Sequence, residues 1–473
     1  MKNTQPHLDE SSPQTVTEFI ETHNGRHGIK IGFTNQSLSP HAGLSTFIGF
    51  LHGQRFKQKL AEWLPKRTSP NAQPAADLAL GFVVGVLAGA KKLAQVGYLR
   101  ADGLLAQLLG IRRMPSGCAL SRLFAQFGGA AQNSHCFGRL WQWCAQRLSS
   151  RSGGYTLDLD TTHLLHEQAI GKEGVRLGHT PKGLRRCFHP LLGMLAEAKL
   201  VVGFWLRPGN TRCDNNVVAF TQELLGRLPR YLHIGLVRAD AGFFEEKWLQ
   251  LLEAKGLAYI VVGRLHEPLR QLIGKQTRWE QTDLPGTEVA ERIYQAWSWG
   301  CPRRVILIRH RLAQRPEAGG KLLVDCPGYA HQILVTNLGQ TVGALQAWRT
   351  YNGRAGSENI IRELNECFAL PDICLEKFYA TEAALSLAVL SYNLCVLFQR
   401  HLGWQQRVSA ATLRFRLFTT GGIISVSGGY PTLRLAVRAG PVRFWWARIL
   451  EKIVCPFRNC VAVDSSPPAL GIC

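Results

Sequence analysis

The chain has 473 residues, a length that predicts two to four domains and allows large buried cores. Its 55 lysines and arginines outnumber 33 acidic residues and give a formal charge of +22. This balance argues against a cationic partner. It favours a polyanion, with nucleic acid ahead of an acidic membrane surface, although basic residues that only maintain solubility are an alternative.

Cysteine spacing and apolar runs restrict the class of protein further. The 13 cysteines include no C-x-x-C pair, which argues against zinc-ribbon and thioredoxin-like motifs. We therefore expect reduced thiols in a cytoplasmic protein, associated with the bacterial nucleoid if it acts on DNA. The polar N-terminal stretch lacks an apolar signal segment. The apolar run from Leu78 to Ala90 is shorter than the roughly 20 residues of a membrane span, so we expect no membrane insertion.

Residues 1–150 are expected to form a helical N-terminal region that binds DNA. A short strand is possible in IKIGF, and apolar residues recur at helical spacing from Leu44 to Ser149. Two of these helices flank the segment IRRMPSG, where Ser116 is a suitable N-cap. The arrangement is compatible with a helix-turn-helix, and an ordinary antiparallel helix pair is the alternative. The candidate phosphate contacts here are Arg112, Arg113 and Arg122.

The rest of the chain changes character three times. Residues 151–265 alternate strand-like runs with helical stretches, which predicts an α/β core. Residues 266–345 contain short strands joined by glycine, proline and polar turns, and we interpret them as a β-rich insertion. Helices resume in 346–400, where the second part of the core is expected. Residues 401–473 form a basic and irregular C-terminal region.

The segment YTLDLDTTH carries the first acidic cluster. If it is a strand, Asp158, Asp160 and Thr162 point to one face, because side chains alternate along a strand. Two carboxylates on one face of an apolar strand are costly unless they are paired or bound to a metal ion. A divalent cation would explain their placement.

A third acidic residue follows a later strand, in VRADAGFF. Asp240 lies where an apolar strand ends and a glycine-containing turn begins. Ligands of open α/β sheets usually bind at the carboxyl ends of strands, so Asp240 is a candidate site residue. The alternative is that its side chain only caps the turn or the following helix.

The segment YNGRAGSENIIREL has helical spacing and a polar face. Glu358 and Arg362 share that face, and Tyr351 and Arg354 precede them. A simple ion pair between Glu358 and Arg362 is one interpretation, but it leaves the tyrosine and the second arginine unexplained. In the other interpretation, Glu358 completes a metal site, and the two arginines, Arg354 and Arg362, hold phosphates. The apolar stripe expected to face the core comprises Ile361, Leu364 and Phe368.

Together these motifs resemble the DDE transposases of bacterial insertion sequences. YNGRAGSENIIR resembles the Y-R-E-K signature of the insertion-sequence-4 type, with Arg362 in place of the usual lysine. With LDLDTT, RPGNTRCDN and VRADAGFF, it is most similar to the related insertion-sequence family 1380. The resemblance covers about residues 155–400. The family's further basic residue falls at Asn365, which is neutral.

The resemblance implies an RNase H-like catalytic core interrupted by the β-rich insertion. It makes Asp160, Asp240 and Glu358 the catalytic residues and the ligands of two Mg2+ ions, with Mn2+ as an alternative ion. The family's first aspartate is usually followed two positions later by threonine, so Asp160 with Thr162 fits and Asp158 becomes a supporting carboxylate. The residues implied to bind DNA are Tyr351, Arg354 and Arg362, together with Trp297 or Trp299 as a stacking platform for a flipped base. For both tryptophans the alternative is a place in the core.

The expected function is that of a DNA transposase with cut-and-paste chemistry. The protein would cleave strands at the ends of its element and join them to target DNA, with double-stranded DNA as the partner and a homodimer on the paired ends. One alternative is a non-catalytic or domesticated DNA-binding regulator. The other is an RNase H-like nuclease without strand transfer.

Overall fold

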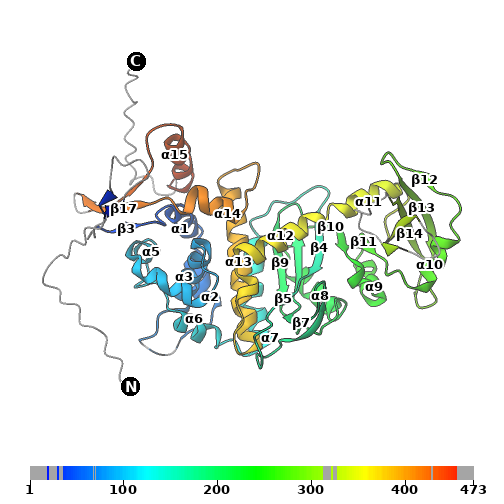
Figure 1. The fold of residues 1–473 in the computed structure, drawn as a ribbon, viewed down its shortest axis with the longest axis horizontal. Helices are drawn as coiled ribbons and strands as arrows, with labels where there is room; N and C mark the ends of the chain where they lie inside the picture. The colour runs from blue at the N-terminus through cyan, green and yellow to red at the C-terminus, as the bar shows by residue number, and fades with distance from the viewer. Residues whose placement is uncertain are drawn as a thin grey trace, which may run out of the picture.

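The protein is a mixed α/β structure built around one large mixed sheet, as the alternating pattern predicts. The computed structural model describes residues 19–20, 29–30, 36–67, 69, 71–312, 321–322, 328–427 and 430–454. Figure 1 shows an elongated molecule, with the N-terminal helices at one end, the strands of residues 155–262 in the middle and those of residues 280–336 at the other end. The possible strand in IKIGF corresponds to β2 (Ile29–Lys30), which pairs with β1 (Phe19–Ile20).

Apolar residues at helical spacing form a group of helices before the sheet. Ser116 caps one of them, since its Oγ accepts a hydrogen bond from the backbone N–H of Ala119 at 3.2 Å. Arg112, Arg113 and Arg122 are exposed on this short helix and the turn before it, and their contact with DNA stays a prediction. The elements are α1 (Leu44–Gly53), α2 (Phe56–Trp63), α3 (Ala75–Ala88), α4 (Leu93–Tyr98), η1 (Leu99–Ala101), α5 (Gly103–Leu108), α6 (Gly117–Phe124) and α7 (Ala130–Ala145).

Five strands make one half of the large sheet, in the order β9-β8-β4-β10-β11, with β9 at its edge. Strand β8 runs antiparallel to β4 and β9, whereas β10 is parallel to both β4 and β11. Helix α8 (Val217–Arg227) connects β9 to β10, and α9 (Glu246–Ala254) connects β10 to β11. The strands are β4 (Tyr155–Thr161), β8 (Leu191–Leu195), β9 (Leu200–Trp205), β10 (Ile234–Ala239) and β11 (Tyr259–Val262). A smaller sheet contains β5 (Leu164–Leu165), β6 (Arg176–Thr180) and β7 (Gly183–Phe188).

The β-rich segment extends this same sheet. Strand β16 pairs antiparallel with β11, and β14, β13 and β12 follow outward, so the sheet has ten strands with β15 beside β16. The segment also begins with a helix that the sequence did not predict. The elements are α10 (Glu267–Gly274), β12 (Glu280–Gln281), β13 (Thr287–Tyr294), β14 (Arg303–Arg311), β15 (Lys321–Leu322) and β16 (Tyr329–Thr336).

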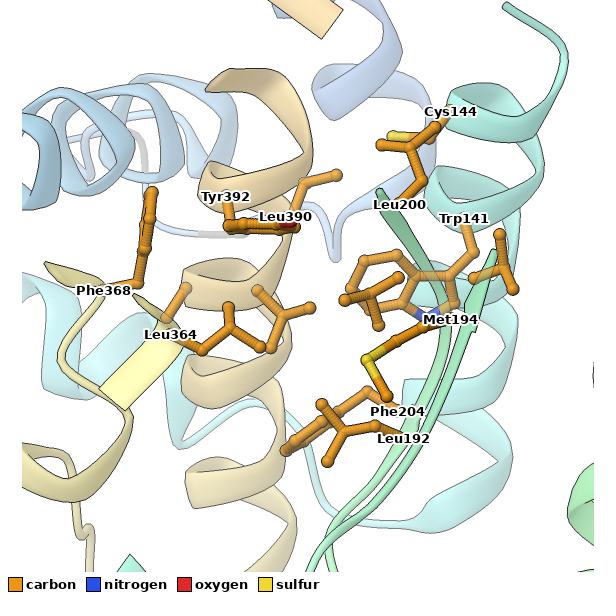
Figure 2. Close-up of a cluster of buried hydrophobic side chains, with 14 of the residues drawn as sticks. Trp141, Cys144, Leu192, Met194, Leu200, Phe204, Leu364, Phe368, Leu390 and Tyr392 are labelled. Atoms are coloured by element: carbon orange, nitrogen blue, oxygen red, sulfur yellow. The ribbon is translucent and has the colours of Figure 1, made fainter. Parts of the chain in front are cut away.

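Helix α13 (Phe378–His401) is the centre of the hydrophobic core. It packs against α7 and β9, and on its other side against α12 (Ala355–Cys367), which follows α11 (Ala344–Asn352). Figure 2 shows Leu364 of α12 and Phe368, which directly follows that helix, facing α13 from one side, with Met194 and Phe204 of the sheet on the other. This packing fixes the position of α12. The predicted stripe is therefore mostly correct, but Ile360 replaces Ile361 as its buried member.

Helix α13 also has the length and composition of a membrane span. Its most apolar stretch is wholly buried inside the protein, which is the position of a core helix. In the part of the chain that the structure describes, the bent pair formed by α3 with residues Leu93–Ala101 passes the same test as a second, broken span.

Within the described residues 401–427 and 430–454, the C-terminal region is not irregular, contrary to the sequence-based expectation. It returns to the N-terminal helices: β17 pairs with β3 (Leu38–Ser39), and α15 contacts α1. Arg414 Nε donates a hydrogen bond to the carbonyl oxygen of Leu87 at 2.9 Å. The elements here are the 3-10 turn η3 (Leu370–Asp372) before α13, then α14 (Ala410–Leu413), the π-helix η4 (Arg414–Phe418), β17 (Gly422–Ser427), β18 (Tyr430–Leu435) and α15 (Pro441–Val454).

Candidate active site

Three acidic residues from distant segments line one pocket of about 440 Å³. Asp160 lies near the end of β4, Asp240 directly follows β10, and Glu358 lies in the first turn of α12. The structure thus brings together the three residues that the sequence singled out as catalytic. The remaining residues that line the pocket are Thr161, Arg354, Ile361, Arg362, Asn365 and Glu366.

Sheet register explains why the two aspartates meet. Strands β4 and β10 are parallel neighbours, and Asp158 pairs with Arg238 in their register. Two residues further along each strand, Asp160 and Asp240 reach the same edge of the sheet. Because carboxyl ends of parallel strands lie together, this edge gathers side chains that are 80 residues apart in the sequence.

Asp158 sits beneath the pocket in a buried hydrogen-bond network. It accepts two bonds from the guanidinium of Arg238, at 2.7 and 2.8 Å, and a third from Ser357 Oγ at 2.7 Å. Arg238 also donates to the carbonyl oxygen of Thr350 at 2.5 Å. A Cβ atom on Gly353 would lie only 2.7 Å from Nη1 of Arg238, so glycine leaves room for this contact. Asp158 therefore joins two strands to α12 and does not line the pocket.

Asp160 is the most buried of the three pocket acids, with 7% of its surface exposed. Burial raises its pKa to about 6, and the nearby carboxylates of Asp240 and Glu358 add to the rise. Arg354 and the backbone N–H of Thr161, at 2.8 Å, act in the opposite direction. The pKa of Asp160 therefore depends on the carboxylates of Asp240 and Glu358, as expected for three acids in one pocket.

Arg354 supplies positive charge inside this group of acids. Its Nη2 lies 2.9 Å from Oδ1 of Asp160 and 3.9 Å from Oδ2 of Asp240. Tyr351, at the end of α11, is buried beside it and is not among the residues that line the pocket. Asp240 lines the pocket and also caps the turn that follows it, because its Oδ1 accepts a hydrogen bond from the backbone N–H of Gly242 at 2.8 Å.

The polar face of α12 differs in detail from the simple ion-pair interpretation. Arg362 lines the pocket, is exposed, and donates to Oδ1 of Asn359 at 2.7 Å. Among the ion pairs of the described residues, none joins Glu358 to Arg362. Thr161 lines the pocket where Thr162 was expected, since Thr162 lies just beyond the end of β4.

The two tryptophans of QAWSWG have different environments. Trp299 is buried against Phe244 and Tyr294, with ring centroids 5.9 and 5.6 Å away. The suggestion that Trp299 stacks on a base is therefore wrong for this conformation, because neighbouring rings and the guanidinium of Arg303 occupy its surroundings. Trp297 is 95% exposed and stays a candidate.

Sequence reasoning missed several neighbours of the acids. Arg238 lies two residues before Asp240, and Ser357 lies directly before Glu358. Only the folded structure reveals that Arg238 and Ser357 share Asp158 as a partner. His163 stacks on His189 with ring centroids 4.2 Å apart, and His189 lies beside the loop that contains Cys213. The partner of His163 could not be found from spacing alone.

The acids suit a magnesium site by chemistry, because carboxylate oxygens are the ligands that Mg2+ prefers. As the side chains stand, however, no three His, Cys, Asp or Glu residues in the described part of the chain are grouped closely enough to hold a metal ion. The guanidinium of Arg354 provides the positive charge between the two aspartates.

A larger cavity, of about 710 Å³, lies away from the acids. It is lined by residues of α7, β9, α8 and α13, and none of the predicted site residues belongs to it. The acidic pocket therefore remains the candidate active site because of its chemistry, not its size.

The fold and the pocket together define a class: a basic, mixed α/β protein that gathers acids from three separate segments at one edge of a sheet. Residues 22–454 match the family described as Transposase DDE domain group 1, and the chain belongs to that family. It is thus a DDE transposase, of a family that generally depends on divalent metal ions.

Two further comparisons complete the findings. The cryo-EM structure of the piggyBac transposase synaptic complex with hairpin DNA is similar, with a TM-score of 0.42 and 11% sequence identity over 81% of each chain. No curated protein matches the chain.

Proposed function

We propose that this transposase belongs to a bacterial insertion sequence of the Y-R-E-K type, related to family 1380, and moves it by a cut-and-paste route. The observation that carries the proposal is the meeting of Asp160, Asp240 and Glu358 in one pocket. Membership of the DDE transposase family supports it. We further propose a cytoplasmic protein that acts on double-stranded DNA as a homodimer without inserting into membranes.

The proposed RNase H-like core comprises β9, β8, β4, β10 and β11 with the helices that connect them. The mixed strand order and the position of two acids at carboxyl ends of adjacent parallel strands support this assignment. We keep 266–345 as the insertion of this core, 346–400 as its second part, and 1–150 as the region that binds element ends.

In the proposed mechanism, Asp160, Asp240 and Glu358 would hold two divalent ions, which supply activation of water or a 3′-hydroxyl and stabilise the leaving oxygen. Asp160 must be ionised to bind a metal ion. Burial raises its pKa and so favours the protonated form, which means that metal binding has to displace that proton. Arg362 is exposed at the pocket wall and would contact a phosphate next to the scissile bond. Thr161 orients Asp160 through its backbone N–H.

The stability of the metal-free protein is expected to fall as the pH rises through about 6. Burial raises the pKa of Asp160 from its ordinary value of 3.8 to about 6. Between these values the folded chain binds more protons than the unfolded chain, so this stabilisation is complete below 3.8 and is lost above about 6. The loss corresponds to roughly 3 kcal/mol. Urea unfolding with a chelator at about pH 5 and about pH 8 measures the upper part of this window, a loss of about 1.4 kcal/mol.

The matched control for this titration is Asp160→Asn, which has no proton to lose at that position. The difference in unfolding free energy between wild type and this variant should decrease from the acidic to the alkaline condition. A difference that is independent of pH would contradict the assignment.

Trp297→Ala is expected to weaken binding of an element end that carries an unpaired base by roughly 1–3 kcal/mol, the value of one lost base stack. The motive is the nearly complete exposure of Trp297 on the insertion, together with the base-holding role that the resemblance implies. Fluorescence anisotropy measures the affinity. Tyr231→Ala, which removes a half-exposed ring before β10, outside the N-terminal region and the insertion, is the control and should leave it unchanged. Equal weakening on fully paired DNA would argue against stacking.

The function itself is tested with purified protein, Mg2+ and DNA that carries the ends of the element. We expect cleavage at the ends and products joined to a target plasmid. Cleavage without joined products would favour an RNase H-like nuclease. Binding of the ends without any cleavage would favour a DNA-binding regulator.

A further inference from the structure

We propose that Arg354 is an internal counter-cation for the acid pocket, which holds Asp160 and Asp240 together in the absence of metal and competes with divalent ions for them. The inference rests on the proposed function, because it concerns the regulation of the same site. It gives Arg354 a positioning role that precedes any contact with DNA.

The position of Arg354 carries the first step. Its guanidinium bonds Oδ1 of Asp160 at 2.9 Å, approaches Oδ2 of Asp240 to 3.9 Å, and reaches the carbonyl oxygen of Leu159 at 3.4 Å. All three contacts are made by Nη2. The residue is only 7% exposed, so its charge acts in a poorly solvated setting where electrostatic effects are strong.

The contacts of the two aspartates carry the second step. Each uses one oxygen to accept a backbone N–H, from Thr161 for Asp160 and from Gly242 for Asp240. In Asp160 the same oxygen, Oδ1, also contacts Arg354, whereas in Asp240 the other oxygen, Oδ2, faces it. A divalent ion that bridged the same carboxylates would share this small space with the guanidinium and be repelled by it. The absence of any three-residue metal cluster among the described residues agrees with a site that Arg354 keeps closed to ions.

Third, one N–H group of Arg354 lacks a hydrogen-bond partner among the described residues. It is the buried Nε, so the guanidinium is not fully satisfied where it lies. Buried donors without partners cost free energy. A DNA phosphate offers two oxygens that match the guanidinium fork. Movement of Arg354 to a phosphate would satisfy it and free both aspartates, so DNA binding and metal binding would favour each other.

Metal affinity without DNA tests the proposal directly, and Mn2+ is the probe because electron paramagnetic resonance measures its free concentration. Arg354→Gln should bind Mn2+ at least about tenfold more tightly than wild type, because a like charge near the ion is removed. Arg362→Gln is the matched control. It removes the same charge from the wall of the same pocket. Among the described residues Arg362 donates to Asn359 and forms no ion pair with Asp160 or Asp240, so its effect should be much smaller.

An affinity of Arg354→Gln equal to or below that of wild type would overturn the proposal, as would an equal gain in Arg362→Gln. A second measurement uses wild type alone and does not depend on the folding of a variant. Phenylglyoxal, which modifies accessible arginines, should label Arg354 more in saturating Mn2+ than in chelator, as followed by mass spectrometry. Unchanged labelling would also overturn the proposal. A protein that shows both Mn2+ responses but cuts no DNA would instead refute the proposed function.

Discussion

Replacing Asp160 with asparagine is expected to reduce DNA cleavage by on the order of 10³-fold or more, because a preorganised charge at the reacting centre is lost. The side chain keeps its size, and asparagine can still accept the backbone N–H of Thr161, so the fold should survive. Asp240→Asn and Glu358→Gln should give losses of similar size. Single-turnover cleavage of labelled element ends in Mg2+ is the measurement.

The pocket itself offers the control for this prediction. Glu366 lines the same wall on α12 but is not one of the three proposed catalytic residues, so Glu366→Gln should keep nearly full activity. Combining two of the catalytic substitutions should add little to either alone, because such residues act as a unit. Substantial cutting by Asp160→Asn, or an equal loss in Glu366→Gln, would refute the assignment.

Arg238→Met is expected to destabilise the protein by about 3–5 kcal/mol, because it leaves the fully buried carboxylate of Asp158 without its cation. Cleavage should fall as well, since Ser357 shares that carboxylate and directly precedes Glu358. Urea unfolding monitored by circular dichroism gives the stability, and the cleavage assay gives the second effect.

Two comparisons isolate the buried ion pair. The double variant Asp158→Leu with Arg238→Met removes both charges and should recover much of the lost stability, because no unpaired buried charge remains. Arg349→Met breaks the exposed pair with Asp283 and should leave the stability nearly unchanged, because solvent screens such pairs. If Arg238→Met and Arg349→Met had equal effects, the buried network would not have the importance given to it here.

The acids of the candidate site were within reach of sequence reasoning. Asp160 and Asp240 lie at ends of apolar strands, and Glu358 lies on the polar face of a helix, so each had a local signal. The resemblance supplied what local patterns lack, namely that three such signals belong to one site. Their catalytic role stays a prediction.

Other features depend on contacts between distant segments and left no local trace. The bond from Arg238 to Asp158 follows from the register of two strands, and the pairing of β16 with β11 joins the insertion to the main sheet. Trp297 and Trp299 are two residues apart in a polar context, yet one is exposed and the other buried. Their difference depends on Phe244 and Tyr294, which the intervening sequence does not identify as neighbours.

The pairing of β3 with β17 has a consequence for biosynthesis. The N-terminal helices are translated before the strands of the large sheet, but β3 pairs with β17 and α1 packs on α15, almost 400 residues later. This end of the molecule therefore matures last, although its helices are made first. A translation product that stops after α13 would expose the surfaces of β3 and α1 that these elements cover, so late nonsense mutations should yield unstable chains and silence the element.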